Sequence, residues 1–453
     1  MMIAINNFLS KYIVWYPAFL LRGQHNIWKA MNEYGKSQYY EPDQLRAVQW
    51  EQFGRILLSA YNNIEFYRMK YKAAGVHPDD IRCRDDIRKL PLLTKKEIIA
   101  NQNIIYNNNY SGKKFRRSTS GSTGIPLIFY KDSLSMAKMD AILYRNYSWM
   151  GIDIGDRQAR FWGHPLNNRE RFRLNFQDRV LNRLRLSPFE LEEKNYRRYL
   201  KQMESFKAQY IYGYAQSVFQ FSDYFYEKRK DLSYLDLKAV ILTGEMVFPH
   251  QIAIIKTVFG CDVTEEYGCT EVGVMAFRCR HGNMHLMENL LIEESADISD
   301  GSGNIVVSEL YGSLFPFIRY QIGDRGHINY NKECPCGRKL PVFEGIFGRQ
   351  DEFIRCSGGK RVDPYIMEYL LDEMPSDCGD VSQFRIIQKS QDHIEVFFVA
   401  KGNPERIREY VGKEFSAKLS RDMKIEFHFV PFLERAATGK CRCFISEISG
   451  TLK

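Results

Sequence analysis

The sequence lacks the features that define several common protein classes. Ten cysteines in 453 residues are too few for a disulfide scaffold, so we expect a reducing, cytoplasmic setting. The apolar stretch from Tyr12 to Leu21 is short and interrupted by Pro17, so we do not expect it to span a bilayer. We find no secretory signal, internal repeat, basic block or nucleic-acid-binding module. Local signatures of Ser-His-Asp or Cys-His catalysis are also missing.

Positive charge is in excess but dispersed. The net charge of +9 favours anionic partners, and without a basic block a small phosphorylated ligand is the simplest partner; a merely basic surface is the alternative. The N-terminal segment combines Phe8 and Trp15 with Lys11 and Arg22. Two interpretations stay open for it: a helix docked on its own domain, or peripheral contact with a membrane surface.

Hydroxyls and glycines are dense in one short segment. It contains Ser118, Thr119, Ser120, Gly121, Ser122, Thr123 and Gly124. Glycines allow a backbone to approach a bulky anion, and successive N–H groups with hydroxyls form an anion-binding nest. We therefore predict a polyphosphate site here, with a flexible Ser/Gly linker as the alternative. The Gly-Lys-Ser/Thr ending of a Walker-type loop is missing.

The order of apolar runs predicts an α/β protein. Helical spacing is expected over residues 49–74, and Thr94 is expected to cap another helix. From about residue 208, buried strands alternate with helices, which indicates parallel layers. Short strands are expected at 305–310 and 317–320. The composition changes after Gly348-Arg349, and the last hundred residues resemble a separate compact α+β unit.

Polar residues follow two of the expected strands. Gly244 and Glu245 follow one strand, and Tyr267, Gly268, Thr270 and Glu271 follow the next. Ligands collect at the carboxyl ends of parallel strands, where a carboxylate such as Glu271 can hold Mg²⁺. A strand cap with an exposed glutamate is the alternative. Asp324 suits ribose hydroxyls or an Asx-type turn, and Lys440 can reach an anionic centre or simply be solvated.

A second group of residues suggests a metal. Cys279, His285, Cys334 and Cys336 lie in Gly/Pro-rich loops and provide four ligands of the kind that zinc takes, with His281 as the substitute for His285. Four protein ligands would make a structural site that ties two loops together. Free thiols beside surface histidines are the alternative.

Taken in order, these motifs resemble those of the adenylate-forming enzymes, the acyl-CoA synthetase superfamily. The resemblance is carried by the Ser/Thr/Gly loop, Tyr267-Gly268-Cys269-Thr270-Glu271, Arg319 to Asp324, Gly348 to Asp351 and Gly439-Lys440. The segment 90–97 (LPLLTKKE) and the Cys-Pro-Cys-Gly-Arg loop resemble the phenylacetate–CoA ligase-like branch, which includes proteins of capsular polysaccharide biosynthesis. The resemblance implies an adenylation domain of layered α/β subdomains over 1–348 and a small mobile α+β lid over 349–453.

The resemblance also implies roles for individual residues. Residues 118–124 would hold ATP phosphates, Glu271 would bind Mg²⁺, and Asp324 would hold the ribose. Arg349 would contact phosphate or ribose, and Asp351 would be the hinge. Lys440 would bridge the carboxylate and the α-phosphate. The adenine and carboxylate region would be lined by Gly244, Glu245, Tyr267, Gly268 and Thr270.

The implied activity is adenylation of a small carboxylic acid by ATP, followed by transfer to the thiol of CoA. Two alternatives stay open. The acceptor can instead be a sugar amine or hydroxyl or a carrier, or the chain can be a nucleotide-binding scaffold without catalysis. Cys441-Arg442-Cys443 is an unusual sequence after Lys440, and the first forty residues match nothing in the family. The identity of the acid is not readable from the sequence.

Overall fold

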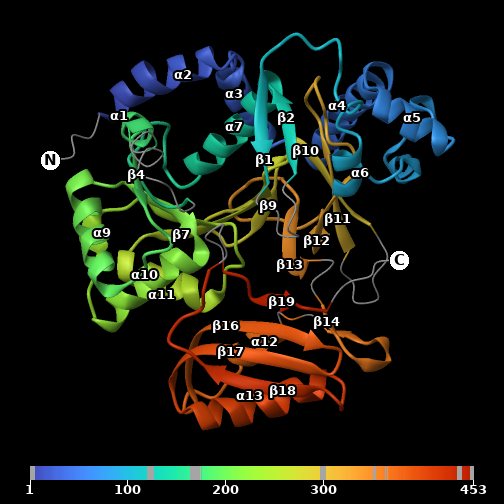
Figure 1. The fold of residues 1–453 in the computed structure, drawn as a ribbon. Helices are drawn as coiled ribbons and strands as arrows, with labels where there is room; N and C mark the ends of the chain where they lie inside the picture. Colours follow the sequence, from blue (N-terminus) through green and yellow to red (C-terminus); the bar gives the residue numbers. More distant parts are fainter. Residues whose placement is uncertain are drawn as a thin grey trace. The chain divides into compact units, whose positions relative to one another are not determined.

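The computed structural model describes residues 6–119, 127–163, 174, 176–295, 303–349, 353–362, 364, 366–435 and 441–448. The chain forms two compact units (Figure 1). Unit 1 comprises residues 1–295, 305–322 and 327–344, and unit 2 comprises residues 296–304, 323–326 and 345–453.

Most elements in about the first two hundred residues are helices. Their bounds are α1 Asn7–Leu9, η1 Ser10–Trp15, α2 Tyr16–Leu21, α3 Ile27–Ser37, α4 Pro42–Asn63, α5 Glu65–Ala73, η2 Pro78–Asp80, η3 Arg84–Lys89, α6 Lys95–Ala100, β1 Lys114–Ser118, β2 Ile128–Asp132, α7 Ser133–Ser148, β3 Gln158–Phe161, β4 Arg183–Leu186 and α9 Glu193–Phe206.

The remaining elements alternate between helix and strand and then become mainly strands. Their bounds are β5 Tyr210–Tyr214, α10 Ala215–Glu227, η4 Ser233–Leu235, β6 Ala239–Thr243, α11 Pro249–Phe259, β7 Asp262–Cys269, β8 Gly273–Arg278, β9 Met284–Leu286, β10 Leu290–Ser295, β11 Gly303–Glu309, β12 Tyr320–Asn329, β13 Val342–Arg349, β14 Ile354–Arg355, η5 Ser357–Gly359, β15 Arg361–Val362, α12 Ile366–Asp372, β16 Gly379–Ser390, β17 His393–Gly402, α13 Pro404–Lys418, β18 Lys424–Phe429 and β19 Phe444–Ser446.

A large mixed sheet forms the centre of the fold. Among the described residues it has eleven strands in the order β10-β11-β12-β13-β9-β8-β7-β6-β5-β3-β4. The adjacent strands β4, β3, β5, β6 and β7 pair in parallel. The adjacent strands β7, β8, β9 and β13 pair antiparallel. β6 is buried at every position, as expected for a strand of a parallel sheet that is covered on both faces.

Unit 2 has its own hydrophobic core. Its four-stranded sheet has the order β18-β17-β16-β19 and packs with α12 and α13. Ile386, Val396 and Phe398 point from the sheet into this core, and Ile407 and Val411 meet them from α13. An α/β fold with a separate small α+β unit is therefore confirmed.

Two local expectations were wrong. The helix expected over 49–74 breaks at Ile64, which has an extended backbone (φ −121°, ψ 114°) and a buried side chain. The strand expected at 317–320 begins only at Tyr320, because Arg319 has a left-handed backbone (φ 51°) that a strand does not accommodate. The cap at Thr94 is confirmed, since its hydroxyl accepts from the N–H of Glu97.

A buried ion pair connects β2 to β11. The Lys131 ammonium lies 2.5 Å from Oε1 of Glu309, and both side chains are almost fully buried. Oε2 of Glu309 accepts from the N–H of Phe317 at 3.0 Å. Beside it, Asp132 caps α7 and accepts from the N–H groups of Ser313 and Leu314 at 2.6 and 3.0 Å. These contacts fix the segment 313–317 against β2 of the β1–β2 hairpin, whose strands flank the Ser/Thr/Gly loop.

We predict that Lys131→Met lowers the free energy of unfolding by about 3–5 kcal/mol, because it leaves the Glu309 carboxylate buried without its cation. Urea denaturation monitored by circular dichroism measures this loss. The matched control is Lys194→Met, which removes an exposed pair with Glu192 and should cause no measurable change. Equal losses in both variants would contradict the assigned importance of the buried pair.

Candidate functional site

The carboxyl ends of the parallel strands lie in register. Tyr214 of β5 is opposite Thr243 of β6, and Thr243 is opposite Glu266 of β7. The residues that follow, Gly244 and Tyr267, therefore leave this part of the sheet at the same edge. Ligands of open α/β sheets bind at such edges.

Gly244 and Glu245 form the turn after β6. Gly244 has φ +77°, a left-handed conformation that favours glycine. Oε2 of Glu245 accepts from the N–H of Gln216 at 2.8 Å, in the first turn of α10. A carboxylate at a helix N-terminus is stabilised by the unsatisfied N–H groups there. Glu245 thus links the ends of β5 and β6.

Residues 267–269 end β7, and residues 270–272 form the tight connection to β8. The Tyr267 ring stacks on Phe343, with ring centroids 5.4 Å apart and an interplanar angle of 23°. A Cβ on Gly268 would lie 2.3 Å from the carbonyl oxygen of Gly273, so only glycine fits. Glu271 is buried, and its Oε1 accepts from the Tyr320 hydroxyl at 2.9 Å. The alternative of an exposed Glu271 is therefore wrong.

The segment 90–97 pairs through backbone hydrogen bonds with the residues on either side of Tyr320. The Leu93 N–H donates to the carbonyl of Arg319 at 2.8 Å, and the Gln321 N–H donates to the carbonyl of Leu93 at 2.9 Å. Because Tyr320 lies between these two bonds, segment 90–97 positions the hydroxyl that meets Glu271. The Arg319 guanidinium donates to the backbone carbonyls of Arg88 and Leu90. Arg319 therefore positions the backbone of this segment.

The other predicted residues are only partly described. Ser118 ends β1, and Thr119 exchanges two hydrogen bonds with Leu127: backbone N–H to carbonyl, and the Leu127 N–H to the Thr119 hydroxyl, each 2.9 Å. Asp324 lies inside β12, not in a turn. Arg349 is the last residue of β13. Ser120, Gly121, Ser122, Thr123, Gly124, Asp351 and Lys440 lie outside the described residues.

The four predicted metal ligands lie together. The ligand atoms of Cys279, His285, Cys334 and Cys336 are all within 4.8 Å of one another. The sulfurs of Cys279 and Cys334 are 3.6 Å apart, and Sγ of Cys336 is 3.3 Å from Nε2 of His285. Zn–S bonds of ~2.3 Å in a tetrahedron give S···S edges of about 3.8 Å, so the cluster can close on zinc. His281 is exposed and lies outside the cluster.

The His285 ring is already prepared to act as a ligand. Burial lowers the pKa of His285 to about 4, so the imidazole is neutral at neutral pH. Its Nδ1 lies 3.1 Å from the carbonyl oxygen of Leu340, and this bond places the proton on Nδ1. The Nε2 lone pair then faces the cysteines. Burial raises the pKa of the Cys279 thiol to about 11, so a cation would have to displace a proton there.

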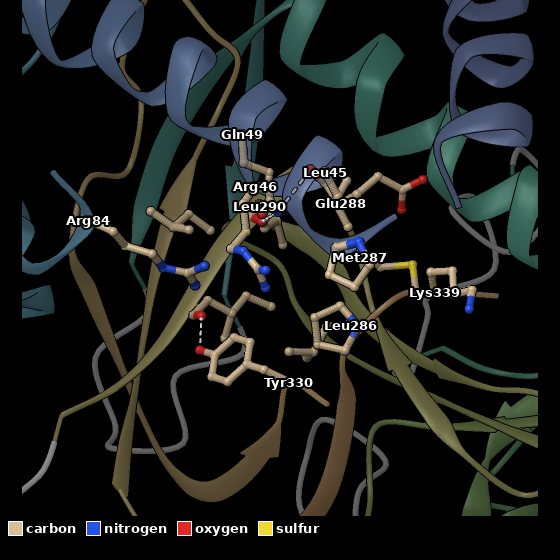
Figure 2. A pocket seen from close by; sticks show the side chains of 14 residues that line it. Leu45, Arg46, Gln49, Arg84, Leu286, Met287, Glu288, Leu290, Tyr330 and Lys339 are labelled. Carbon is tan, nitrogen blue, oxygen red and sulfur yellow. Dashed lines mark hydrogen bonds between the residues drawn. The ribbon is translucent and has the colours of Figure 1, made fainter. Parts of the chain in front are cut away.

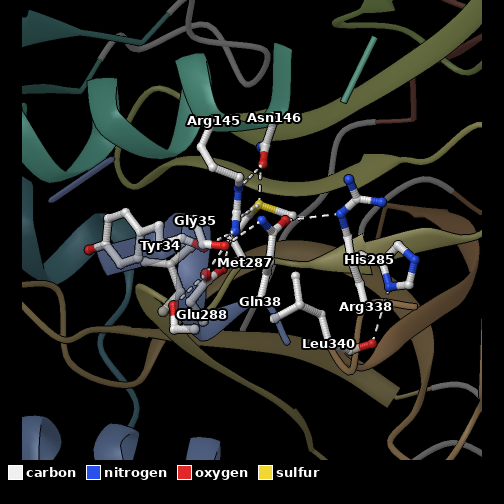
Figure 3. A network of polar contacts seen from close by, with 12 residues as sticks. Tyr34, Gly35, Gln38, Arg145, Asn146, His285, Met287, Glu288, Arg338 and Leu340 are labelled. Carbon is white, nitrogen blue, oxygen red and sulfur yellow. Dashed lines mark hydrogen bonds and ion pairs between the residues drawn. The ribbon is translucent and has the colours of Figure 1, made fainter. Parts of the chain in front are cut away.

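A polar network connects the N-terminal helices to this cluster (Figure 3). The Arg145 guanidinium forms two bonds of 2.8 Å with Glu288, and Ser37 donates to the same carboxylate at 2.9 Å. Oε1 of Gln38 accepts from Trp149 and from Arg338, both at 2.9 Å. Because Arg338 lies in the loop of Cys334 and Cys336, α3 and α7 hold that loop in place.

A small pocket lies between α4 and the β10 region (Figure 2). Arg46, Arg84 and Lys339 line it together with apolar side chains, and the Tyr330 hydroxyl donates to the carbonyl of Ile292 at 3.1 Å. Its volume of about 30 Å³ admits one or two waters and no nucleotide. None of the predicted nucleotide-site residues lines it, so it is not the candidate site.

Sequence reasoning missed a buried carboxyl group at the same edge as Tyr267. Glu266 receives a hydrogen bond from the Tyr212 hydroxyl on Oε1 at 3.3 Å, and the hydroxyls of Tyr147 and Thr243 lie near its carboxyl group, although none of the described residues is within hydrogen-bond distance of the buried Oε2. Burial raises the pKa of Glu266 to about 7 and the pKa of Tyr212 well above its usual range. Trp162 continues this wall, with its ring centroid 4.4 Å from that of Tyr214. The only sequence signal was the position of Glu266 at the end of a strand.

The chain is similar in sequence to several known proteins. Residues 356–447 match the family model of the CapK C-terminal domain. The chain is 22% identical to protein CapK of Staphylococcus aureus over 92% of this chain and 93% of that protein. It is 25% identical to phenylacetate-coenzyme A ligase of Thermus thermophilus over 74% and 76% of the two chains.

A solved structure shows the same fold. The crystal structure of 2-hydroxyisobutyryl-CoA ligase in the postadenylation state aligns with a TM-score of 0.71, at 18% identity, over 91% of this chain and 92% of that one. The fold is therefore that of an adenylate-forming CoA ligase. In sequence, the chain is in addition similar to CapK and to phenylacetate-coenzyme A ligases, and its residues 356–447 match the CapK C-terminal domain.

We predict that Glu266→Gln changes how stability depends on pH. Because the pKa of Glu266 is raised from 4.5 to about 7, the folded chain keeps a proton that the unfolded chain loses, and stability falls as pH rises from 4.5 to 7. Glutamine has no such proton, so the variant should gain stability relative to the parent over this range, by up to roughly 3 kcal/mol. Urea denaturation at pH 5 and pH 8 measures the difference. Glu65→Gln, at an exposed position, is the control; an identical pH response in both variants would refute the assignment.

Proposed function

We propose that this protein activates a carboxylic acid with ATP as an acyl-adenylate and transfers the acyl group to the thiol of CoA. One observation carries this proposal: Glu245 follows β6, and Tyr267 and the buried Glu271 lie at the end of the neighbouring β7, in a chain with the fold of the adenylate-forming ligases. The sequence relatives include phenylacetate-coenzyme A ligases, which supports CoA as the acceptor.

ATP would be held by residues at this edge and by the loop that precedes β2. The backbone N–H groups and hydroxyls of residues 118–124 would bind its phosphates. Its adenine would lie against Gly244, Glu245, Tyr267, Gly268 and Thr270. Asp324 would accept from the ribose hydroxyls, and Arg349 would contact phosphate or ribose. Glu271 would hold Mg²⁺, which neutralises phosphate charge when bound.

The chemistry would proceed in two balanced steps. A carboxylate oxygen of the acid forms a bond to the α-phosphorus of ATP, the bond to the β-phosphate oxygen breaks, and pyrophosphate leaves. The CoA sulfur then forms a bond to the acyl carbon, its proton is lost, and AMP leaves. The protein supplies placement and charge stabilisation. Lys440 would bridge the acid and the α-phosphate in the first step, and Asp351 would be the hinge that lets unit 2 turn before the second.

The acid would lie beside Glu266. Oε2 of Glu266 is buried and has no hydrogen-bond partner within normal distance among the described residues, so a donor on the acid could bind it. The Tyr212 and Trp162 rings provide an apolar wall. An acid that carries an amine or hydroxyl group would satisfy the carboxyl of Glu266. A plain aryl or alkyl acid would offer no donor to its Oε2.

A second acceptor class is supported by the match to CapK over nearly the whole chain. In this alternative the adenylate forms in the same way, but a sugar amine or hydroxyl takes the acyl group. Adenylation is common to both alternatives, and consumption of the CoA thiol separates them. A non-catalytic nucleotide-binding scaffold would show neither reaction.

We further propose that Cys279, His285, Cys334 and Cys336 hold a structural zinc ion. Four protein ligands leave no open position for catalysis, so the ion would fix the loops 279–285 and 334–340.

Cys334→Ser is predicted to lower the zinc content from about one ion per chain to near zero and to lower the unfolding temperature. Elemental analysis and differential scanning fluorimetry measure both. Cys261→Ser, outside the cluster, should retain both values. A folded parent protein that contains no zinc after purification in zinc-supplemented buffer would exclude this site.

For the activity itself, ATP–pyrophosphate exchange with a panel of carboxylic acids is the direct assay. Lys440→Ala should slow exchange by about two to three orders of magnitude and still convert a supplied acyl-adenylate to product, because Lys440 acts only in the first step. Lys418→Ala is the matched control and should retain both activities. Equal loss of both half-reactions in Lys440→Ala would contradict the assigned role, and no exchange with any acid would exclude adenylation.

A further inference from the structure

The N-terminal helical segment has an exposed apolar face. α1, η1 and α2 follow one another without interruption from Asn7 to Leu21 and lie at the periphery of unit 1 (Figure 1). Within it Phe8 is 66% exposed, Ile13 65% and Leu21 74%. Its remaining exposed apolar side chains are Leu9, Tyr12, Tyr16 and Leu20. We call these seven residues the N-terminal apolar face.

The opposite side of this segment docks on unit 1. Trp15 and Phe19 are buried, and both rings meet Tyr144 of α7 at 5.7 and 6.0 Å. Lys11 forms an ion pair with Asp153 at 2.7 Å. One side of the segment is therefore core, as the interpretation of a docked helix expects, and the other side is apolar and open to solvent.

Such a surface is unusual for a helix that is already docked. Docked helices normally present polar residues on the side away from the core. Between Asn7 and Leu21, Lys11 is the only charged residue, and its charge is paired. A contiguous exposed apolar surface of this kind marks a site of interaction.

The charge at one end of the face favours an anionic partner. Arg22 follows Leu21 and is exposed, and the ammonium of the exposed Lys113 donates to the carbonyl of Leu21. Lys114 is exposed beside it. A second copy of this chain would bring its own basic residues against these, whereas a surface of anionic phospholipid complements both the apolar face and its basic end.

No helix in the described part of the chain is long and apolar enough to cross a bilayer. Contact with the lipid would therefore be interfacial, with the aromatic rings of Phe8, Tyr12 and Tyr16 at the level of the headgroups. We propose that the N-terminal apolar face binds reversibly to membranes that contain anionic phospholipid. This proposal does not depend on the proposed enzymatic function.

Co-sedimentation with vesicles tests the proposal on the full chain. The parent protein should bind vesicles of phosphatidylglycerol and phosphatidylcholine, and its binding should fall with salt and with removal of phosphatidylglycerol. Phe8→Ser/Ile13→Ser should lower the partition coefficient about tenfold or more, since each side chain loses its apolar burial. Arg22→Glu/Lys114→Glu should lower it by a similar factor on anionic vesicles only.

The matched control is Met69→Ser/Phe432→Ser, which removes two exposed apolar side chains elsewhere and should bind as the parent does. Unfolding midpoints equal to that of the parent show that each variant folds. A parent protein that stays in the supernatant with both vesicle types at low salt overturns the proposal. So does sedimentation of the parent as a dimer that Phe8→Ser/Ile13→Ser converts to a monomer, because the face then binds a second copy.

Discussion

The parallel register of β5, β6 and β7 is the constraint on which the candidate site depends. Tyr214, Thr243 and Glu266 stand side by side because their strands pair without offset. A shift of one residue in β7 would move the side chains of Glu266 and Tyr267 each to the other face of the sheet and change which residue of β7 stands beside the end of β6. Full burial of β6 makes such a shift costly, since every one of its side chains packs in the core.

Two buried ion pairs connect segments of unit 1. The Arg145–Glu288 pair fixes α7 to the turn before β10, and the Lys131–Glu309 pair fixes β2 to β11. Such pairs add little net stability compared with apolar packing, yet a lost partner is costly. They therefore favour one arrangement of these segments. The cysteine and histidine cluster acts in the same direction on the loops 279–285 and 334–340.

Local patterns predicted the parts of the fold that local chemistry determines. The Thr94 cap and the alternation of strands and helices from about residue 208 were predicted correctly from capping residues and apolar runs. The break at Ile64 was not predicted, because this buried isoleucine fits the helical spacing and gives no local signal that the helix ends there. The irregular backbone at Arg319 depends on the distant carbonyls of Arg88 and Leu90, which no sequence window contains.

The candidate site shows the same division. The spacing predicted the four residues that cluster, with His285 preferred and His281 as its substitute, and the three-dimensional arrangement brings His285 to the cysteines. The motif around Glu271 pointed to a carboxylate at a strand end, yet its burial and its bond to Tyr320 come from a strand far along the chain. Glu266 carries no motif of its own, and its importance comes from the rings that enclose it.

The central claim is that a nucleotide binds at the shared edge of β6 and β7. A crystal structure of the full chain with ATP and Mg²⁺ tests it most directly. The account predicts adenine beside Tyr267 and Gly244, phosphates against residues 118–124 and the metal ion on Glu271. Nucleotide bound elsewhere, with Glu271 still paired only to Tyr320 and these residues free of ligand, would contradict it.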